Sequence, residues 1–187
     1  MWYVRTPQAR GEHRPLAQPM WFDHRQHAGS FQIDCRYCHS TVERARYAGV
    51  PATEVCLPCH NQVWLESRDF APVRNSLATG EPIQWNRVYS LPAFVFFDHS
   101  SHVTKGVGCE TCHGRVDRMR RVEQVVSLTM NWCVDCHNNP APNLRPLDQV
   151  TTMGWAPPSP ARALEYGQTL AARYDVRPST DCSTCHR

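Results

Sequence analysis

Long apolar runs are missing from the start of this 187-residue sequence. Residues 1–19 contain neither an 18-residue apolar stretch nor the shorter apolar core of a secretory signal, which excludes a membrane span within them. Glycine is also scarce, since nine glycines stand against fifteen prolines, a balance that favours turns and short helices. Neither sign of charge is in large excess, because the formal net charge is +3. Cysteine and histidine, by contrast, are abundant, with ten residues of each.

The ten cysteines form five C-x-x-C pairs with none left over, and a histidine follows every pair directly. Random placement of these residues predicts only about 0.03 such motifs in a chain of this length. In chain order the five motifs contain Cys35, Cys38 and His39; Cys56, Cys59 and His60; Cys109, Cys112 and His113; Cys133, Cys136 and His137; and Cys182, Cys185 and His186.

Each position of a C-x-x-C-H motif has a role in covalent haem attachment. The two thiols form thioether bonds with the haem vinyl groups, and the histidine ligates the iron as its proximal ligand. Zinc ribbons also use C-x-x-C pairs, but they do not require a histidine after every pair. A thioredoxin-like motif occurs once, near a βαβ unit, and a disulfide framework needs no histidines. The sequence therefore predicts five covalently bound c-type haems.

Five haems leave about 37 residues for each cofactor, too few for an ordinary core around each one. The predicted fold is therefore a multihaem cytochrome c, mostly irregular with short α-helices and little β-structure, whose core is built on the haems. The ionised propionates and ferric irons would bring the net charge to about −2. The basic sequence thus gives no reason to expect binding to nucleic acid.

Covalent haem attachment takes place outside the cytoplasmic membrane, so we expect the protein on the periplasmic side of that membrane. Residues 1–19 are then expected to be an N-terminal tail that follows, or forms part of, an export signal or membrane anchor. Trp2 and Tyr3 would lie at the membrane interface. The alternative is a frayed N-terminus.

An F-D-H-x-x-H element precedes the first and third motifs, and corresponding positions in the two copies are 74 to 77 residues apart. This duplication predicts a first two-haem unit over residues 20–80 and a second over residues 81–140. Residues 141–187 would contribute a Pro-rich connector, a helix and the fifth haem. Each two-haem unit supplies four histidines, which equals the number of axial positions on two irons.

An electron carrier is best served by irons with both axial positions filled. The histidines of each F-D-H-x-x-H element are three residues apart, so they share a face of a helical turn and can serve two different haems. Phe22 and Phe97 are expected to pack on a haem edge or, alternatively, in an ordinary core. The predicted distal ligands are His24, His27, His99 and His102.

The fifth motif has no F-D-H-x-x-H element of its own. Met130, three residues before Cys133, is the preferred distal ligand for its iron, and Met119 is the alternative. A thioether ligand would raise the reduction potential of that haem. His13 is a third candidate, while ordinary core packing remains open for both methionines.

One longer helix and several short helices on the motifs are expected. Ser159 suits an N-cap and Pro160 suits the first position of a helix over about 160–174. A shorter helix is expected over 129–138, on the fourth motif. Residues 82–99 are aromatic, β-branched and interrupted by prolines, which favours extended chain or an edge strand.

Several stretches, among them "IQWNRVYSLPAFVFFDHSSHVTKGVGCETCHGRVDRM", "LTMNWCVDCHNNP" and the terminal "CSTCHR", resemble the pentahaem cytochrome subunit of bacterial alternative complex III. The units also resemble small class III multihaem cytochromes. The similarity runs from about residue 20 to 187 and is weakest over 140–158.

This resemblance implies an electron-transfer subunit that is not itself an enzyme and that relays electrons from a membrane quinol-oxidising complex to a cytochrome or other acceptor. It also implies several partners, namely a monohaem cytochrome c, an iron–sulfur subunit and quinol-binding membrane subunits. Members of that family carry an N-terminal transmembrane anchor, which this sequence lacks.

Two other functions fit the same motifs. A free electron shuttle would need no complex, but the aromatic segments around Trp64, Trp85, Phe94 and Trp155 suggest large docking surfaces. A multihaem reductase would keep one haem open to substrate. The sequence contains no C-x-x-C-K motif and enough ligands to close every iron, which argues against a reductase.

Overall fold

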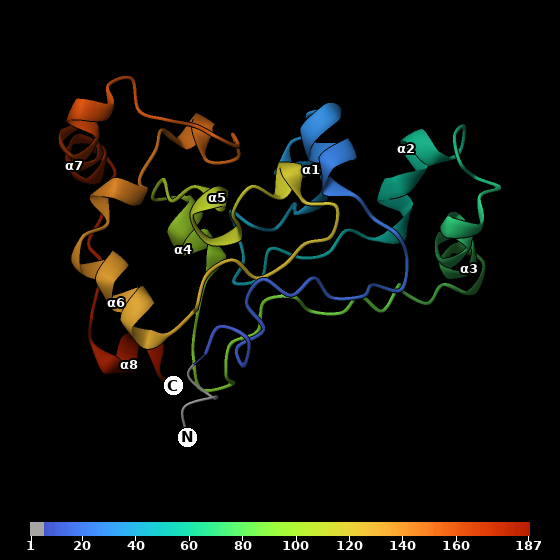
Figure 1. Ribbon diagram of the computed structural model, residues 1–187, viewed down its shortest axis with the longest axis horizontal. Helices are drawn as coiled ribbons and strands as arrows, with labels where there is room; N and C mark the ends of the chain where they lie inside the picture. Colours follow the sequence, from blue (N-terminus) through green and yellow to red (C-terminus); the bar gives the residue numbers. More distant parts are fainter. Residues whose placement is uncertain (1–5) are drawn as a thin grey trace.

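The computed structural model describes residues 6–187, which form an elongated chain of short helices joined by irregular segments (Figure 1). The α-helices are α1 (Cys35–Cys38), α2 (Leu57–His60), α3 (Ala71–Thr79), α4 (His99–Val103), α5 (Cys109–His113), α6 (Met130–Asn138), α7 (Ala163–Arg173) and α8 (Cys182–Cys185). A π-helix, η2 (Arg25–Ser30), precedes them, and the 3₁₀ turns are η3 (Thr53–Cys56), η4 (Arg68–Phe70), η5 (Val116–Arg118), η6 (Ala141–Asn143), η7 (Leu147–Gln149) and η8 (Pro160–Arg162).

Trp2 and Tyr3 lie outside the described residues, so their predicted place at a membrane interface stays a prediction. Within residues 6–187, no helix combines the length and the apolar character needed to cross a membrane.

Regular sheet is absent from residues 6–187, where strand pairing is limited to three isolated bridges. The expectation of an edge strand over 82–99 is therefore wrong, since only Val95 of this segment pairs, with His186. Pro82 and Pro92 each lack a backbone N–H and hold a fixed φ, which prevents a continuous ladder. The extended-chain alternative describes most of the segment, and its end joins the C-terminus through a 2.7 Å hydrogen bond from the Phe96 N–H to the Cys185 carbonyl.

The helices that carry the motifs are too short to be stable in isolation. Side-chain caps help to start them. Asp34 accepts a hydrogen bond from the Arg36 N–H at the start of α1, and Thr129 accepts one from the Trp132 N–H at the start of α6. The predicted helix over 129–138 is thus present as α6, with Thr129 as its N-cap.

The predicted C-terminal helix is present as η8 followed by α7. The side chain of Ser159 makes no capping hydrogen bond, contrary to the expectation. Its backbone carbonyl accepts from the Arg162 N–H instead, at 3.0 Å. A short 3₁₀ turn begins the helix, and this turn is closed by backbone bonds. Gly167 of α7 packs directly on η6, where a side chain would collide with the Ala141 carbonyl.

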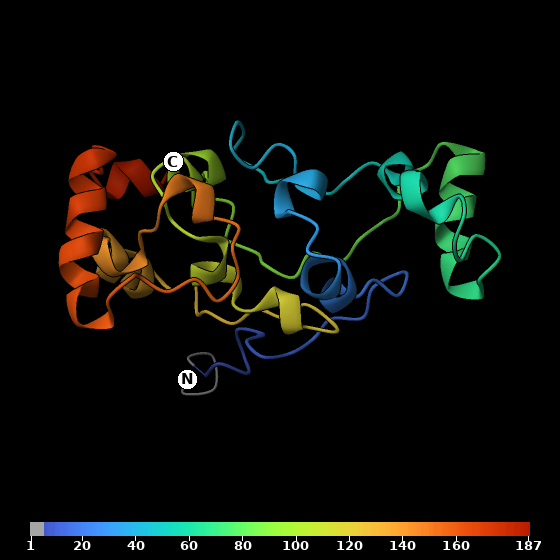
Figure 2. The same cartoon turned by 90° about the horizontal axis from the view of Figure 1, so that it is seen from above.

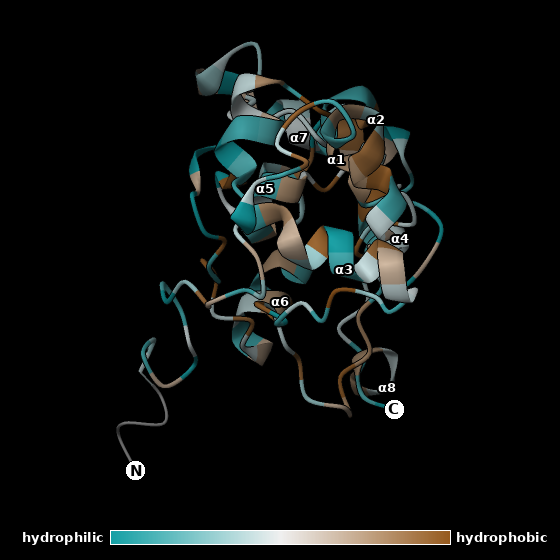
Figure 3. Cartoon of the chain, turned by 90° about the vertical axis from the view of Figure 1, so that its right-hand side faces the viewer, coloured by the Kyte–Doolittle hydropathy of each residue, from teal (hydrophilic) through white to brown (hydrophobic). Residues whose placement is uncertain are grey.

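The apolar core is small and divided. The buried hydrophobic residues of the described chain are Val42, Phe70, Val73, Val103, Ala141, Leu144, Val150 and Leu170. Large apolar side chains such as Phe31 and Trp64 are 68% and 67% exposed. Figure 3 shows hydrophobic stretches on connecting segments as well as on helices. The free energy gained from so little buried apolar surface cannot offset the conformational entropy that 187 residues lose on folding. The chain therefore needs additional apolar material in its core.

Candidate metal centres

Three pairs of histidine rings face each other at nearly the same separation. A metal ion held between two imidazoles, at about 2.0–2.1 Å from each nitrogen, sets the ring centres about 6.3 Å apart. Each pair joins one histidine of an F-D-H-x-x-H element to the histidine of a C-x-x-C-H motif. The separations of ring centres are 6.2 Å for His27 and His60, 6.2 Å for His99 and His113, and 6.1 Å for His102 and His137.

His24 lies beside the histidine of the first motif. Burial, followed by the neighbouring rings of His39 and His27, lowers the pKa of His24 to about 4. His27 already faces the second motif, so His39 is the motif histidine left for His24. Three of the four F-D-H-x-x-H histidines thus face three different motifs, and His24 is near the histidine of the remaining one.

The outer nitrogens of these rings are held by the backbone. A carbonyl oxygen can only accept a hydrogen bond, so each bonded Nδ1 must carry the proton and leave the Nε2 lone pair free for a metal. The Nδ1–oxygen pairs are His27 with Asp23 at 2.9 Å, His39 with Gly49 at 2.7 Å, His60 with Val63 at 3.2 Å, His99 with Arg46 at 2.9 Å, His102 with Asp98 at 2.7 Å and His137 with Ser179 at 2.7 Å. This donor set fits iron held by two imidazoles.

A phenylalanine orients the two rings of each F-D-H-x-x-H element. Phe22 stacks on His27 with ring centres 4.4 Å apart and meets His24 edge-on at 4.8 Å and 82°. Phe97 repeats this arrangement with its own two histidines, at 4.5 Å and 31°, and at 4.9 Å and 86°. The two rings therefore point toward different motifs, as they must if each ring is to bind a different metal ion. The expected packing of Phe22 and Phe97 on a haem edge stays a prediction.

The first and third motifs meet at their opening cysteines. The Cys109 N–H donates to the Val150 carbonyl at 2.9 Å, and the Cys35 thiol lies 3.9 Å from the carbonyl of the next residue, Thr151. A side-chain hydrogen bond with Cys35 lowers the pKa of the Cys109 thiol. Cys35 and Cys109 are corresponding residues of the two repeats, so the repeats meet head to head.

Two further pairs of neighbouring motifs can be identified because the histidines of one F-D-H-x-x-H element lie next to both motifs of each pair. In the first repeat, His24 is the N-cap of η2 and His27 lies within it, next to the first and second motifs. In the second repeat, α4 carries both histidines that face the third and fourth motifs. His137 of the fourth motif bonds to Ser179, three residues before the fifth. Figures 1 and 2 both place the motif helices α2, α1 and α5 in this order from one end of the molecule, with α6 and α8 together toward the other end. Followed from neighbour to neighbour, the order of the motifs is second, first, third, fourth, fifth.

The fifth motif is less clearly paired. The ring of His186 lies 5.9 Å from that of Phe94. Met130, the first residue of α6, is 66% exposed, which rules out ordinary core packing for it. Met119 lies against Gly114, next to the third motif. His13 is exposed, with Nδ1 3.5 Å from a carboxylate oxygen of Glu123.

Two residues near the motif histidines were not predicted as part of any site. The Tyr89 ring lies 4.6 Å from that of His113, and its hydroxyl bonds to the Cys112 carbonyl at 3.0 Å. Phe70 stacks on His60 at 4.7 Å. Neither residue belongs to a motif, and their contacts arise from packing between distant segments, so no local pattern could have identified them.

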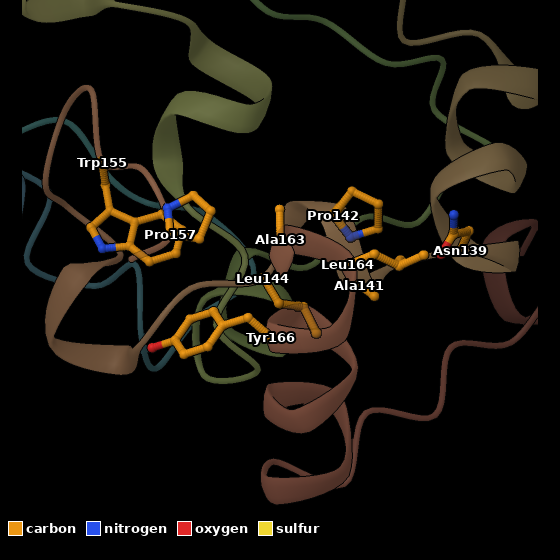
Figure 4. A pocket seen from close by; sticks show the side chains of 9 residues that line it. All are labelled: Asn139, Ala141, Pro142, Leu144, Trp155, Pro157, Ala163, Leu164 and Tyr166. Atoms are coloured by element: carbon orange, nitrogen blue, oxygen red, sulfur yellow. The ribbon is translucent and has the colours of Figure 1, made fainter. Parts of the chain in front are cut away.

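An apolar cavity of about 330 Å³ adjoins the fourth motif (Figure 4). Trp155 and Tyr166 line one side of it with ring centres 6.2 Å apart, and Asn139, two residues after His137, lies at the opposite side. This cavity adds apolar space close to the fourth motif.

Comparisons with known proteins agree with this chemistry. Residues 95–187 match the family described as cytochrome c7 and related cytochrome c. A relative from Nitratidesulfovibrio vulgaris (strain Hildenborough), named menaquinone reductase, multiheme cytochrome c subunit, is 33% identical over 97 residues. The match covers 51% of this chain and 45% of that relative, so this chain matches under half of the relative's length. The matched residues 95–187, which contain three of the five motifs, are thus similar to multihaem cytochromes of the c7 type.

Proposed function

We propose that this chain binds five c-type haems, one at each motif, and relays electrons for a membrane quinol-oxidising complex on the periplasmic side. The observation that carries the proposal is the set of three imidazole pairs at 6.1–6.2 Å, each of which has room for one iron. The resemblance to the pentahaem subunit of alternative complex III supplies the type of complex.

The proposed attachment residues are the ten cysteines, which all carry free thiols in the structure. Four irons would have two histidine ligands, and the fifth would have a histidine and a methionine. The proposed axial pairs, in spatial order, are His60 with His27, His39 with His24, His113 with His99, His137 with His102, and His186 with Met130.

Met130 is preferred over Met119 because of where the two side chains lie. Met130 is exposed on α6, and burial together with the neighbouring Cys185 raises the pKa of the Cys133 thiol on the same helix. The start of α6 is therefore close to the fifth motif. Met119 lies beside the third motif, whose histidine already faces His99.

A haem bound at each motif would supply a one-electron couple. The chain's own histidines, with Met130 at the fifth motif, would hold the irons, and backbone hydrogen bonds orient six of the histidine rings, so a change of iron charge would require little movement. Electrons would pass in the spatial order of the motifs, between the second motif at one end and the fifth at the other. Trp64 is exposed beside the second motif and Phe94 beside the fifth, which makes these ends the proposed docking positions for partners.

The proposed partners are the other subunits of the complex, including a monohaem cytochrome c and an iron–sulfur subunit, and quinol chemistry would take place in those partners. The N. vulgaris relative is named as a subunit of a menaquinone reductase, which supports a place in a quinone-linked complex. The same relay serves either direction of electron flow, and the resemblance favours quinol oxidation.

The test is purification from membranes of the source organism, followed by subunit identification, intact mass and pyridine haemochrome absorbance. Five haems per chain and co-purification with quinol-binding membrane subunits are expected. Fewer than five haems in the matured protein would refute the site assignment. Isolation without any membrane subunit would favour the free shuttle, and carbon monoxide binding to the reduced native protein would favour the reductase.

A further inference from the structure

Arg145 is a buried cation with an incomplete set of partners. Its side chain is 9% exposed, and its Nη1 donates to the Thr152 carbonyl at 2.9 Å. Its Nε is buried and has no hydrogen-bond acceptor within residues 6–187. Glu110 is the nearby carboxylate, but its oxygen is 3.9 Å from Nη1, which is long for a hydrogen bond. Burial of a charge with so little compensation is costly, and burial lowers the pKa of Arg145.

The chain makes room for this guanidinium at one place. The guanidinium packs against Gly108, where any side chain would collide with it. Gly108 immediately precedes Cys109, so the cation lies at the start of the third motif. The guanidinium carbon is also 5.4 Å from the ring centre of Trp155, a residue that lines the apolar cavity.

The same short segment connects Arg145 to both repeats. The three consecutive carbonyls of residues 150, 151 and 152 lie next to the Cys109 N–H, the Cys35 thiol and the Arg145 Nη1, respectively. The cation is therefore held at the contact between the first and third motifs, where electrons would cross from one repeat to the other.

We infer that Arg145 is an electrostatic residue that raises the reduction potentials of the haems at the first and third motifs. This inference rests on the proposed function. Reduction adds one electron, taken from a neighbouring reduced haem, and removes one positive charge at the iron, while Arg145 keeps its proton throughout. A fixed cation nearby favours the less positive, reduced state, and its effect is larger where water is excluded.

The other charged groups at this place offset that cation only in part. Glu110 is shared between Arg145 and Arg115, and Arg115 is bonded at 2.6 Å to Asp117. Near Cys35, Asp34 is paired with an arginine of its own at 2.9 Å. Glu110 is thus the carboxylate that opposes Arg145, and its neutralisation should have the opposite effect.

The experiment uses the full-length, matured cytochrome with Arg145→Gln, Glu110→Gln, the double variant and Arg145→Lys. Arg162→Gln is the matched control, since this arginine is 77% exposed. Redox titration followed by absorbance and electron paramagnetic resonance resolves the individual haems, and haemochrome absorbance counts them. Arg145→Gln should move one or two midpoints to more negative potential and leave the others in place. Glu110→Gln should move the same midpoints to more positive potential, the double variant should return them toward wild type, and Arg145→Lys should stay near wild type.

Midpoints that stay unmoved in both single variants, or that move in the same direction in both, would overturn the inference. If Arg145→Gln loses haem, the Glu110→Gln titration decides alone, since an upward shift supports the inference and its absence refutes it. Arg162→Gln must move no midpoint. A wild-type protein with fewer than five haems would instead refute the proposed function.

Discussion

The two F-D-H-x-x-H elements have the same ring geometry but different helices. In the second repeat, Asp98 accepts hydrogen bonds from the Ser100 and Ser101 N–H groups and starts the α-helix α4. In the first repeat, the corresponding Asp23 also accepts from a backbone N–H, that of Arg25 at 2.9 Å, but it additionally binds the Arg25 guanidinium at 2.6 Å, and the turn that follows is the π-helix η2. The local helix type can therefore change while the positions of the rings stay the same. Their phenylalanine and backbone contacts, and not the helix, set those positions.

A close backbone contact accounts for the π-helix. A side chain at Gly29 of η2 would lie 2.5 Å from the Asp117 carbonyl, so η2 packs directly on η5. The Phe31 N–H reaches back to the Gln26 carbonyl at 2.9 Å, which is the wider hydrogen-bond spacing of a π-helix. α4 has an ordinary side-chain cap and keeps α-helical spacing.

The largest expected effect comes from removal of one distal ring in each repeat. His99→Ala and His24→Ala should each open one iron of the five, because each removes one of two axial ligands. Carbon monoxide should then bind one haem per chain after reduction, as measured by absorbance. The wild-type protein is the control and should bind none, and His13→Ala, which alters an exposed histidine outside the repeats, should also bind none if Met130 closes the fifth iron. An unchanged spectrum in His99→Ala would show that the 6.2 Å pair with His113 is not a ligand pair.

The fifth motif should respond to a change at the start of α6, the helix of the fourth motif. Met130→His should lower one reduction potential and leave the other four nearly unchanged, because an imidazole is a stronger donor than a thioether. Redox titration measures this shift. Met119→Leu is the matched control, since it alters the methionine beside Gly114 and should move none. A shift in Met119→Leu alone would transfer the assignment to Met119, and no shift in either variant would favour His13.

Much of this arrangement could be predicted from local sequence. The five motifs, the paired histidines on one helical turn and the helix at 129–138 all depend on residues within one or two turns of each other. The spatial order of the motifs depends on contacts between distant segments, such as Cys35 with Thr151 and Cys109 with Val150. The bond between Phe96 and Cys185 that replaces the expected strand pairing is also of this kind, as is the burial of Arg145. Local patterns contain no signal for such contacts.

The ring-orienting phenylalanines should have equivalent, local effects. Phe22→Ala and Phe97→Ala should each cost about 2 kcal/mol of unfolding free energy, below the range for fully buried phenylalanine, because both rings are half-buried. Phe22→Ala should alter the resonance signals of the first and second haems, and Phe97→Ala those of the third and fourth. Denaturant unfolding and electron paramagnetic resonance measure the two effects. Phe→Leu at each position is the control, and a change in all five haem signals would contradict a local role.

The smallest expected effect separates the two aspartates. Hydrogen bonds from Ser100 lower the pKa of Asp98, and the bonded Arg25 lowers the pKa of Asp23. Because both folded-state pKa values lie below the ordinary value near 3.9, the stability that each carboxylate contributes is complete above that pH and is lost as the pH falls through the folded pKa. Loss of the cap in Asp98→Ala should cost about 1 kcal/mol near pH 7, and Asp23→Ala a similar or smaller amount.

Salt should distinguish the two aspartate variants. Arg25 is 44% exposed, so its ion pair with Asp23 is screened, and the cost of Asp23→Ala should shrink as ionic strength rises. Asp98 binds uncharged N–H and hydroxyl groups, so the cost of Asp98→Ala should change little with salt, and Asp98→Asn should recover most of it. Thermal unfolding at two salt concentrations measures both. Equal salt dependence in the two variants would show that the aspartates of the two repeats have the same role after all.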